Sequence, residues 1–466
     1  RGRVVEEGGV AGRGMGKASF EREGAQERLC TFFEVETVGA FGQFSRAEVS
    51  ALGAVLDYLE ITQKGKLPLL AAPVREVAGR VMQIDAATRR NLELTRSMQG
   101  ARAGSLLGAI DRTLTAQGAR LLERRVSSPS CDVAEISARL DAVSVGLADT
   151  RFLADTRDSL RHVPDMERAL SRLGLERGGP RDLASIRNGL GKAGDIGSNM
   201  AKLELPTLLR EAGQKLLGHD ALVDLLDAAL VAEPPLFARD GGFVAAGYDE
   251  ELDASRALRD EGRGVIAKMQ ADYAADTGIA ALKIKHNNVL GYFIEVTATH
   301  AEKMLGAPLN ERFKHRQTTA NQVRFTTPEL NEMETRILNA GGRATEIELR
   351  IFGELRGAIL AEQEAVFAAT GALAEIDLAL GLASIAREED WARPSVDMSH
   401  ALEISQGRHP VVEQALRRQG STSFVPNDCV LAEDDQLWLL TGPNMAGKST
   451  FLRQNALIAV LAQMGS

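Results

Sequence analysis

The spacing of apolar residues predicts a mainly helical chain that is interrupted by one segment with a different period. From about 76 to 235 the apolar positions follow a helical period, with short breaks at 127–130 and 176–182. Residues 248–278 predict a further helix, which Gly262 and Gly264 weaken. Residues 282–288 and 291–297 then alternate with a period of two, around a turn signal at Asn287 and Asn288. The pattern therefore predicts a β-rich island that extends to about Phe325.

A helical pattern returns directly after the island. Thr327 and Pro328 predict an N-cap and a first helical position. Apolar residues then recur at helical spacing as far as Leu380, which predicts one very long helix with an interruption near Gly341 and Gly342. Fifty residues would span roughly 75 Å. We therefore expect the island at the tip of a paired stalk of helices, and a helical bundle with a hairpin insertion is the alternative.

The two ends of the chain mix helical and strand patterns. Residues 51–63 predict a helix before a linker with two prolines, and we interpret residues from about 20 to 70 as a small α/β remnant. After about residue 400, strand patterns occur at 402–405, 429–433 and 436–441. An apolar helix is predicted at 449–465.

Composition limits the class of protein. The chain has 466 residues, of which 44% are hydrophobic and 26% charged, as in soluble globular proteins of two to four domains. Its three cysteines are far apart, which suggests reduced thiols in a cytosolic protein. No apolar run reaches the roughly 18 to 20 residues of a membrane helix, and the N-terminus lacks the apolar region of a signal peptide. Because the sequence has no initiator Met and stops abruptly at Ser466, we expect a fragment cut at both ends.

The stretch TGPNMAGKST, residues 441–450, predicts a phosphate-binding loop. It fits the pattern G-x-x-x-x-G-K-S between an apolar strand pattern and an apolar helix, where backbone N–H groups can surround a phosphate. The residues expected to bind nucleotide there are Gly442, Pro443, Asn444, Met445, Ala446, Gly447, Lys448, Ser449 and Thr450. Lys448 would reach the β- and γ-phosphates, and the Ser449 hydroxyl would bind Mg²⁺. Hydrolysis also needs an acidic residue and a water-orienting group on a later strand. We therefore expect this chain to bind nucleotide weakly at best and not to turn it over, and we assign no catalytic residue.

The β island carries a local excess of positive charge. Residues 281–325 contain seven Lys and Arg against three Glu, although the whole chain has a net charge of −9. A local basic patch is enough to contact nucleic-acid phosphates, and no basic helix suggests base readout in a major groove. A solvated charged face on a small domain remains the alternative. Two Phe-x-Glu matches, at Phe32 and Phe352, lie in apolar patterns and are interpreted as packing residues.

Several motifs in the same order resemble DNA mismatch repair proteins of the MutS family. The phosphate loop matches that family closely, with Ala446 where Gly is more usual. The segments 407–416 and 424–431 resemble the start of its ATPase domain, and 85–95 resembles its helical core. The segments 282–297 and 316–334 resemble its clamp and the returning lever helix. The resemblance covers about residues 20 to 466.

The resemblance implies a multidomain, mainly α fold. Its expected parts are a partial α/β connector and linker (1–73), a helical core (74–247), a lever helix (248–279), a β-rich DNA clamp (280–327), a returning lever helix and core (328–395), and the start of a P-loop, ABC-type ATPase domain (396–466). By the same resemblance Phe424 would stack on adenine, and Val425 and Asn427 would help to hold the base. The residues expected to contact the DNA backbone are Lys285, Asn288, Lys314, Arg316, Gln317, Asn321 and Arg324.

The family's cofactors and partners follow from the resemblance as expectations. They are ATP or ADP with Mg²⁺, double-stranded DNA that is mispaired for the intact protein, a second copy in a homodimer, and a MutL-type partner, in the bacterial cytosol and without a membrane. Family members bind a mispair, exchange ADP for ATP and become a sliding clamp. The mismatch-reading domain, the acidic Mg²⁺ motif, the signature loop and the dimerising helices are not in the sequence. We therefore expect that the chain as given neither recognises mispairs nor cycles ATP.

Three other classes of protein share some of these features. ATPases of chromosome structure and double-strand-break repair also join a phosphate loop to long helices, but there the loop precedes the coiled coil. A paralogous MutS branch that does not read mismatches lacks the connector and the clamp. A non-catalytic helical scaffold that merely holds DNA remains open, and DNA binding that ignores nucleotide would favour it.

Overall fold

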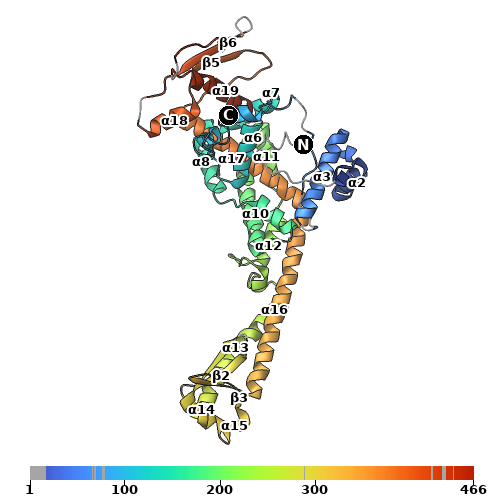
Figure 1. Ribbon diagram of the computed structural model, residues 1–466, viewed down its shortest axis with the longest axis vertical. Coiled ribbons are helices and arrows are strands. Elements are labelled where there is room, and N and C mark those ends of the chain that lie inside the picture. Colours follow the sequence, from blue (N-terminus) through green and yellow to red (C-terminus); the bar gives the residue numbers. More distant parts are fainter. Residues whose placement is uncertain are drawn as a thin grey trace. The chain divides into compact units, whose positions relative to one another are not determined.

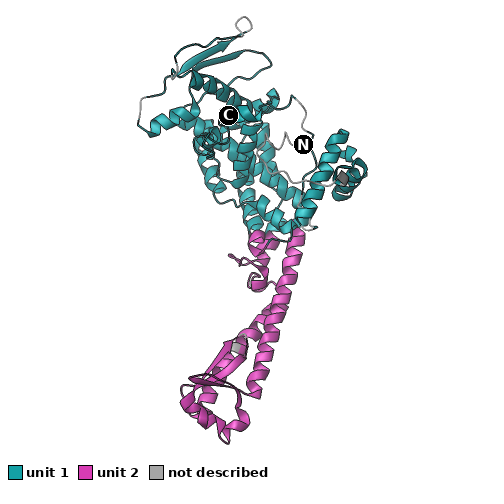
Figure 2. Cartoon of the chain, in the orientation of Figure 1, with its two compact units in different colours: residues 1–178, 185–223, 360–466 teal, residues 179–184, 224–359 magenta. Residues whose placement is uncertain are grey.

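The computed structural model describes residues 17–63, 65, 67, 70–75, 79–287, 289–420, 423–432, 437–443 and 446–466. It divides into two compact units (Figure 2). Unit 1 comprises residues 1–178, 185–223 and 360–466, and unit 2 comprises 179–184 and 224–359. The described residues are mainly helical, with one four-stranded and one two-stranded antiparallel sheet.

Unit 1 is built around one apolar helix, α17 (Gln363–Glu388) (Figure 1). The helices that pack on it are α6 (Ala116–Ser127), α7 (Val133–Ala148), α8 (Thr150–Leu160), α9 (Met166–Gly174) and α11 (Thr207–Lys215). An 18-residue window of α17 has a mean hydropathy of 1.6, so this helix is long and apolar enough to cross a membrane, contrary to our statement on apolar runs. Because 72% of that window is buried inside the protein, α17 has the burial of a core helix.

Four further helices lie between residues 86 and 229, and parts of α10 and α12 belong to unit 2. They are α4 (Ala86–Asn91), α5 (Leu106–Ile110), α10 (Pro180–Met200) and α12 (Asp220–Ala229). Many begin with a side-chain cap; for example, Asp85 Oδ1 accepts a hydrogen bond from the Thr88 amide at 2.9 Å. The prediction of helices from 76 to 235 is confirmed for the described residues.

The N-terminal segment contains only helices among its described residues, 17–63. They are η1 (Lys17–Phe20), α2 (Arg22–Phe33), η2 (Val38–Phe41) and α3 (Arg46–Thr62). The predicted α/β character is therefore wrong for this part. Ala25 and Leu29 lie one turn apart and are buried on one stripe of α2, and this stripe packs against α3. Phe32 packs partly buried at the edge of the same cluster, as predicted.

Unit 2 contains an antiparallel pair of helices, α13 (Glu250–Thr277) and α16 (Pro328–Ala361) (Figures 1 and 2). Arg343 pairs with Glu251 and Arg350 with Asp249 near one end of the pair, and the Tyr273 and Thr327 hydroxyls lie 2.7 Å apart near the other. Thr327 also caps α16 through its hydroxyl, as predicted.

The long helix is not interrupted where the sequence suggested. It passes through Gly341 and Gly342 and ends at Ala361, and α17 begins after Glu362. Ala340 and Ala344 flank the two glycines and are buried. The burial of these alanines outweighs the cost of glycine in a helix, which is about 1 kcal/mol per residue relative to alanine.

The β island forms a four-stranded sheet at one end of this helix pair. Its strands are β1 (Lys283–Asn287), β2 (Gly291–Thr297), β3 (Lys314–Thr318) and β4 (Gln322–Thr326), in the order β1-β2-β4-β3. Two short helices, α14 (Ala298–Leu305) and α15 (Leu309–Arg312), connect β2 to β3. At the predicted β1–β2 turn, Asn287 Oδ1 accepts hydrogen bonds from the Val289 and Leu290 amides, and Asn288 lies outside the described residues.

One face of the sheet closes a small core of its own within unit 2. Ile294, Val296 and Phe325 are at most 2% exposed and pack with Tyr273 and Leu330 of the helix pair. Elsewhere on that pair, Phe352 makes an edge-on contact with Phe243, so the interpretation of Phe352 as a packing residue is confirmed. The island is therefore a separate small core whose other face is not packed on helices.

The C-terminal segment belongs to unit 1. Its elements are β5 (Leu402–Gly407), α18 (Pro410–Arg418), β6 (Asn427–Leu431) and α19 (Lys448–Met464), and β5 pairs antiparallel with β6. The predicted strand at 436–441 is wrong for its described part, 437–441, which is irregular and leaves Leu437 and Leu439 almost fully exposed. A strand needs a hydrogen-bonded neighbour, and none of the described residues pairs with this segment.

Candidate functional site

The phosphate-loop residues lie at the start of α19, as the motif requires. Gly447 precedes the helix with φ = +84°, a left-handed conformation that favours glycine. No side chain caps this helix, so its first N–H groups are open to an anion. The Lys448 amine donates to the carbonyl oxygens of Gly442 and Pro443, the latter at 3.0 Å, so the loop curves around its own lysine. Asn444 and Met445 lie outside the described residues.

The same loop borders a cavity of about 610 Å³ in unit 1. The predicted nucleotide-binding residues that line it are Gly442, Pro443, Ala446, Gly447, Lys448, Thr450, Phe424, Val425 and Asn427. Thus the structure brings the two segments, which are about 20 residues apart in sequence, to one cavity. Its volume is within the range of about 300–1,000 Å³ that is typical of small-molecule sites.

Six residues that line this cavity were not among the predicted binding residues. They are Asp428, Trp438, Leu440, Thr441, Phe451 and Gln454. Phe451 and Gln454 follow Lys448 at intervals of three, so the helical period of α19 could have indicated them. The Trp438 and Phe451 rings are stacked with 6.5 Å between their centroids. The cavity therefore combines the loop before α19 with aromatic and amide side chains.

The residues of this cavity fit the phosphates of a nucleotide, whereas Ser449, the residue expected to bind Mg²⁺, does not line it. Lys448 supplies a positive charge at the loop, and the start of α19 supplies N–H groups for phosphate oxygens. The described residues contain no group of three or more His, Cys, Asp or Glu side chains that could hold a metal ion. A Mg²⁺ ion at this loop would therefore depend on the Ser449 hydroxyl and on phosphate oxygens of the nucleotide.

Ser449 lies beside a different, smaller cavity of about 110 Å³. Glu93, His409 and Arg453 also line it, and Arg453 pairs with Glu93 at 3.3 Å. Burial, together with the charge of Arg453, lowers the pKa of His409, whose Nδ1 accepts the Val412 amide at the start of α18. Thr450 lines both cavities, so it marks the boundary between them.

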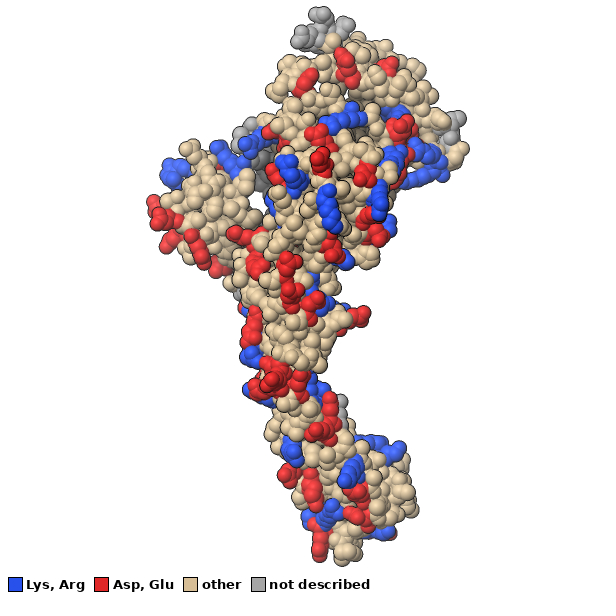
Figure 3. Space-filling model, turned by 180° about the vertical axis from the view of Figure 1, so that it is seen from behind, with Lys and Arg blue, Asp and Glu red and all other residues tan. Residues whose placement is uncertain are grey.

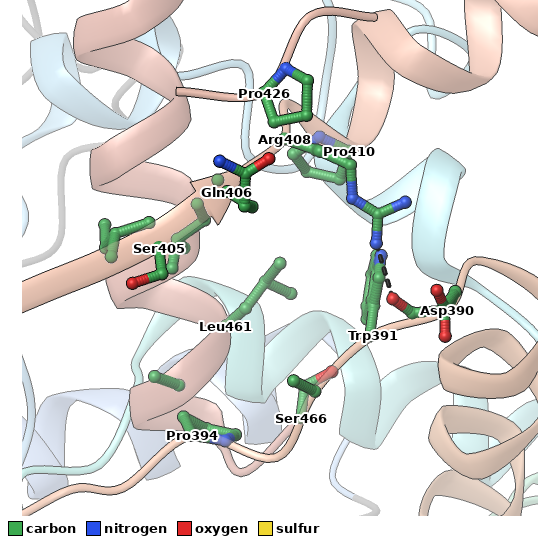
Figure 4. Close-up of a pocket in the computed structure, with 15 residues that line it drawn as sticks. Asp390, Trp391, Pro394, Ser405, Gln406, Arg408, Pro410, Pro426, Leu461 and Ser466 are labelled. Atoms are coloured by element: carbon green, nitrogen blue, oxygen red, sulfur yellow. Dashed lines mark hydrogen bonds between the residues drawn. The ribbon is translucent and has the colours of Figure 1, made fainter. Parts of the chain in front are cut away.

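A third cavity, of about 520 Å³, lies between α19, β5 and the segment after α17 (Figure 4). The Arg408 guanidinium spans one side of it and donates to the carbonyl oxygens of Glu389 and Asp390 at 2.9 and 2.6 Å. Its remaining lining in Figure 4 is largely apolar and includes Trp391 and Leu461. Because Arg408 is already bound to backbone, we assign this cavity no ligand.

The second candidate site is the face of the unit 2 sheet that points away from its core. Residues opposite each other in antiparallel strands share a face, so the register defines this face. The residues assigned to it are Lys283, Lys285, Phe293, Glu295, Lys314, Gln317, Gln322 and Arg324. We call these eight residues the outer face. Its side chains are mostly long and polar, and four of the residues predicted from sequence, Lys285, Lys314, Gln317 and Arg324, lie on it.

A buried carboxylate organises the centre of the outer face. Glu295 is 5% exposed and accepts hydrogen bonds from Lys285 Nζ at 2.6 Å and Arg324 Nε at 3.3 Å. Arg324 also donates to Gln317 Oε1 at 2.8 Å and lies 4.5 Å above the Phe293 ring. Burial alone would raise the pKa of Glu295, but hydrogen bonds from Lys285 and Arg324 lower it below its ordinary value. Lys285 and Arg324 are thus fixed in position and partly neutralised.

The other two cations of the outer face, and Arg316 beside it, are not neutralised by any residue that the structure describes. Lys283, Lys314 and Arg316 are exposed and form no ion pair with any residue that the structure describes. Lys314 reaches only the Asn310 carbonyl, and Arg316, at a bulge in β3, reaches only Asn331 Oδ1 at 3.4 Å. On the side shown in Figure 3, blue and red side chains are mixed over unit 2, and no uniformly positive surface is seen on that side.

The remaining predicted DNA contact, Asn321, is exposed in the turn between β3 and β4. Its carbonyl oxygen accepts the Ala298 amide at 3.2 Å, and its side chain is free to contact a partner. Sequence reasoning missed the roles of Glu295 and Phe293 because it counted charges without pairing them. The period-two alternation of β2, which places residues 293 and 295 on one face, could have indicated both.

Comparison with known proteins gives consistent matches. Family models match at residues 8–71 (MutS domain II), 87–383 (MutS domain III) and 438–466 (MutS domain V). Proteins named DNA mismatch repair protein MutS are 62% identical over 99% of this chain in Paracoccus denitrificans and 62% identical over 97% in Ruegeria sp. strain TM1040. The chain spans about half the length of these relatives, 53% and 52%. Since the domain III model alone matches well over half of its residues, the chain belongs to the MutS family.

Proposed function

We propose that this chain serves DNA mismatch repair by holding double-stranded DNA on the outer face of unit 2 and ATP or ADP in the phosphate-loop cavity of unit 1. The relatives named DNA mismatch repair protein MutS support the process. The single structural observation that carries the DNA-holding role is the cationic outer face on a small domain with its own core. Lys283, Lys314 and Arg316 are exposed there and are without ion pairs among the described residues.

The outer face is suited to the DNA backbone and not to base readout. A flat face of flexible Lys and Arg side chains can follow phosphates, whereas base edges are read mostly by a helix or a ribbon inserted into a groove. Glu295 holds the Arg324 guanidinium and the Lys285 amine at fixed positions, while Lys314 and Arg316 remain adaptable. Sequence-independent contact is what a clamp needs, because it must hold any duplex that carries a mispair.

The ATP-binding role rests on the cavity at α19. Lys448 and the open helix N-terminus would bind the β- and γ-phosphates, Ser449 would contribute to Mg²⁺, and Phe424 would stack on adenine. In the whole protein, exchange of ADP for ATP would convert DNA-bound protein into a sliding clamp. A homodimer, a MutL-type partner and a bacterial cytosolic location complete the proposal.

Duplex affinity measured by fluorescence anisotropy over a range of salt concentrations tests the DNA-holding role. In Lys314→Glu/Arg316→Glu the affinity should fall, and the slope of log affinity against log salt should become shallower by about 1.8, since each lost phosphate contact removes about 0.9. The matched control is Lys268→Glu/Arg336→Glu, which makes the same charge change at exposed positions on α13 and α16. Equal losses in both variants would contradict the assignment to the outer face.

The nucleotide-binding role has its own test. Binding of Mg-ATP to the chain should be detectable by the fluorescence of Trp438, which lines the cavity. Lys448→Ala should abolish it, because the positive charge at the phosphates is lost. ATP binding that survives this substitution unchanged would contradict the assignment of the cavity.

A further inference from the structure

Glu93 is a glutamate in a backbone conformation that usually belongs to glycine. It lies just after α4 with φ = +52°, and the Leu94 amide that follows donates to the Arg89 carbonyl oxygen at 3.2 Å, which closes the end of the helix. Helices commonly end in this way with a glycine or an asparagine, because most side chains make the left-handed conformation unfavourable. A glutamate at this position therefore indicates a role for its side chain that glycine could not fulfil.

Both carboxylate oxygens of Glu93 have partners. Oε1 accepts a hydrogen bond from the Met98 amide at 2.6 Å, and Oε2 accepts one from Arg453 Nη1 at 3.3 Å. The backbone carbonyl oxygen of Glu93 also accepts the Leu106 amide at 2.9 Å. The segment after α4 thus fixes the carboxylate in place, and the carboxylate in turn binds an arginine of α19.

Arg453 lies in the part of α19 that apolar packing does not hold. Further along the helix, residues such as Leu457 and Leu461 are buried, and the helix contacts α6, α7 and β5. Of residues 448–453, all of which the structure describes, none is buried. The ion pair with Glu93 therefore ties the phosphate-loop end of α19 to the helical core.

The ion pair lies on the same side of α19 as the hydroxyl proposed for Mg²⁺. Ser449 and Arg453 are four residues apart, which places them on one face of the helix, and both line the cavity of about 110 Å³ together with Glu93. A binding site needs its groups held to within about 0.5 Å. Fixing Arg453 would therefore fix the position of Ser449, one turn before it, and of the neighbouring Lys448.

We propose that Glu93 is a positioning residue that, through Arg453, holds the first turn of α19 where Lys448 and Ser449 can bind a Mg-polyphosphate group. The inference rests on the proposed nucleotide binding and adds to it a residue that does not line the nucleotide cavity. Because the Arg453 and Glu93 side chains are 39% and 24% exposed, their ion pair contributes little to the stability of the whole fold. Its loss should therefore weaken phosphate binding and leave the fold intact.

The test is a double-mutant cycle on the full chain, with binding measured by isothermal titration calorimetry. Glu93→Gln keeps an oxygen for the Met98 amide and removes the charge that holds Arg453. Glu93→Gln and Arg453→Gln should each weaken Mg-ATP binding about tenfold, and the double variant should weaken it no further, because the two side chains act as one unit. Mg-tripolyphosphate should lose affinity by the same factor as Mg-ATP, since both carry the phosphates.

Thermal unfolding separates this role from a structural one. The Tm of nucleotide-free Glu93→Gln should stay within about 2 °C of that of the unsubstituted chain, whereas the gain in Tm on adding Mg-ATP should fall. The matched control is Glu388→Gln, which removes the carboxylate of another partly exposed ion pair in unit 1, with Arg112 at 2.7 Å. This control should leave Mg-ATP binding unchanged.

Three results would overturn the inference. A larger fall in the Tm of nucleotide-free Glu93→Gln would show that the ion pair supports the fold. Additive losses of affinity in the double variant would show that the two side chains act independently. Mg-ATP binding that does not respond to Glu93→Gln would refute this inference alone, whereas an unsubstituted chain that binds no Mg-ATP would refute the proposed nucleotide binding and the inference with it.

Discussion

The ion-paired centre of the outer face gives a prediction that can be worked out from distances. In Glu295→Gln the neutral amide can no longer accept charge-assisted hydrogen bonds from Lys285 and Arg324, which lie at 2.6 and 3.3 Å. Bonds to a charged group contribute about 1.5–3 kcal/mol each, but the Lys285 side chain is 49% exposed and its share is screened by water. We therefore expect a loss of about 2 kcal/mol in the stability of the sheet.

Hydrogen exchange measures this loss locally. Two kcal/mol corresponds to about 30-fold faster exchange of amides that open with the sheet, such as Ile294 and Phe325. Both tryptophans, Trp391 and Trp438, belong to unit 1, so the thermal transition followed by tryptophan fluorescence should not change. Duplex affinity should not fall either, because the variant removes a negative charge from the outer face.

The control for this prediction is Glu302→Gln. Glu302 lies exposed on α14 of the same unit, so its replacement should change stability by less than about 0.5 kcal/mol. If Glu295→Gln and Glu302→Gln exchange alike, the buried carboxylate contributes nothing to the sheet. The argument that it fixes Lys285 and Arg324 would then be refuted.

Two further predictions concern stability. Gly264→Ala should stabilise α13 by up to about 1 kcal/mol, because nothing lies within 4 Å of the added Cβ. Gly262→Ala should not give this gain, because its Cβ would lie 2.4 Å from the Ile337 side chain. Equal urea midpoints for the two variants would contradict the close contact between α13 and α16 at Gly262. Burial raises the pKa of Asp377 in spite of its hydrogen bonds from Thr115. The protonated Asp377 side chain should therefore contribute its full share to the free energy of unfolding below the unfolded pKa of about 3.9, and this share should be lost as pH rises through the folded pKa. Glu295, whose pKa is lowered, should behave in the opposite sense and lose its contribution as pH falls, and denaturant titrations of Asp377→Asn and Glu295→Gln between pH 3 and 7 should separate the two trends.

Periodicity predicted the long elements well because the burial of one face determines them. The β1–β2 alternation and the helices α13, α16 and α19 follow directly from apolar spacing, which local packing then confirms. The apolar stretch at 437–441 has the same pattern as a strand and forms none, because a strand depends on a neighbour that pattern alone cannot supply. The break between α16 and α17 after Ala361 was likewise not predictable, because no glycine or proline lies there.

The start of α19 directly after Gly447 was predictable because one local motif describes it, and phosphate binding there stays a prediction. The cavity beside α19 was predictable only in part, since Trp438 and Gln454 contribute through tertiary placement. The outer face shows the same limit. Net charge indicated a cationic island, but only the tertiary structure shows that Lys285 and Arg324 share one carboxylate, while Lys314 forms no ion pair with a described residue.

Photo-crosslinking from single positions tests the central claim most directly, namely that the outer face holds duplex DNA. A photoreactive residue at Gln317 on the outer face would be compared with one at Lys202, which is exposed in unit 1. The account predicts that Gln317 crosslinks to duplex DNA of any sequence and that rising salt suppresses the product. Crosslinks that form equally from Lys202, or that form there and not at Gln317, would contradict it.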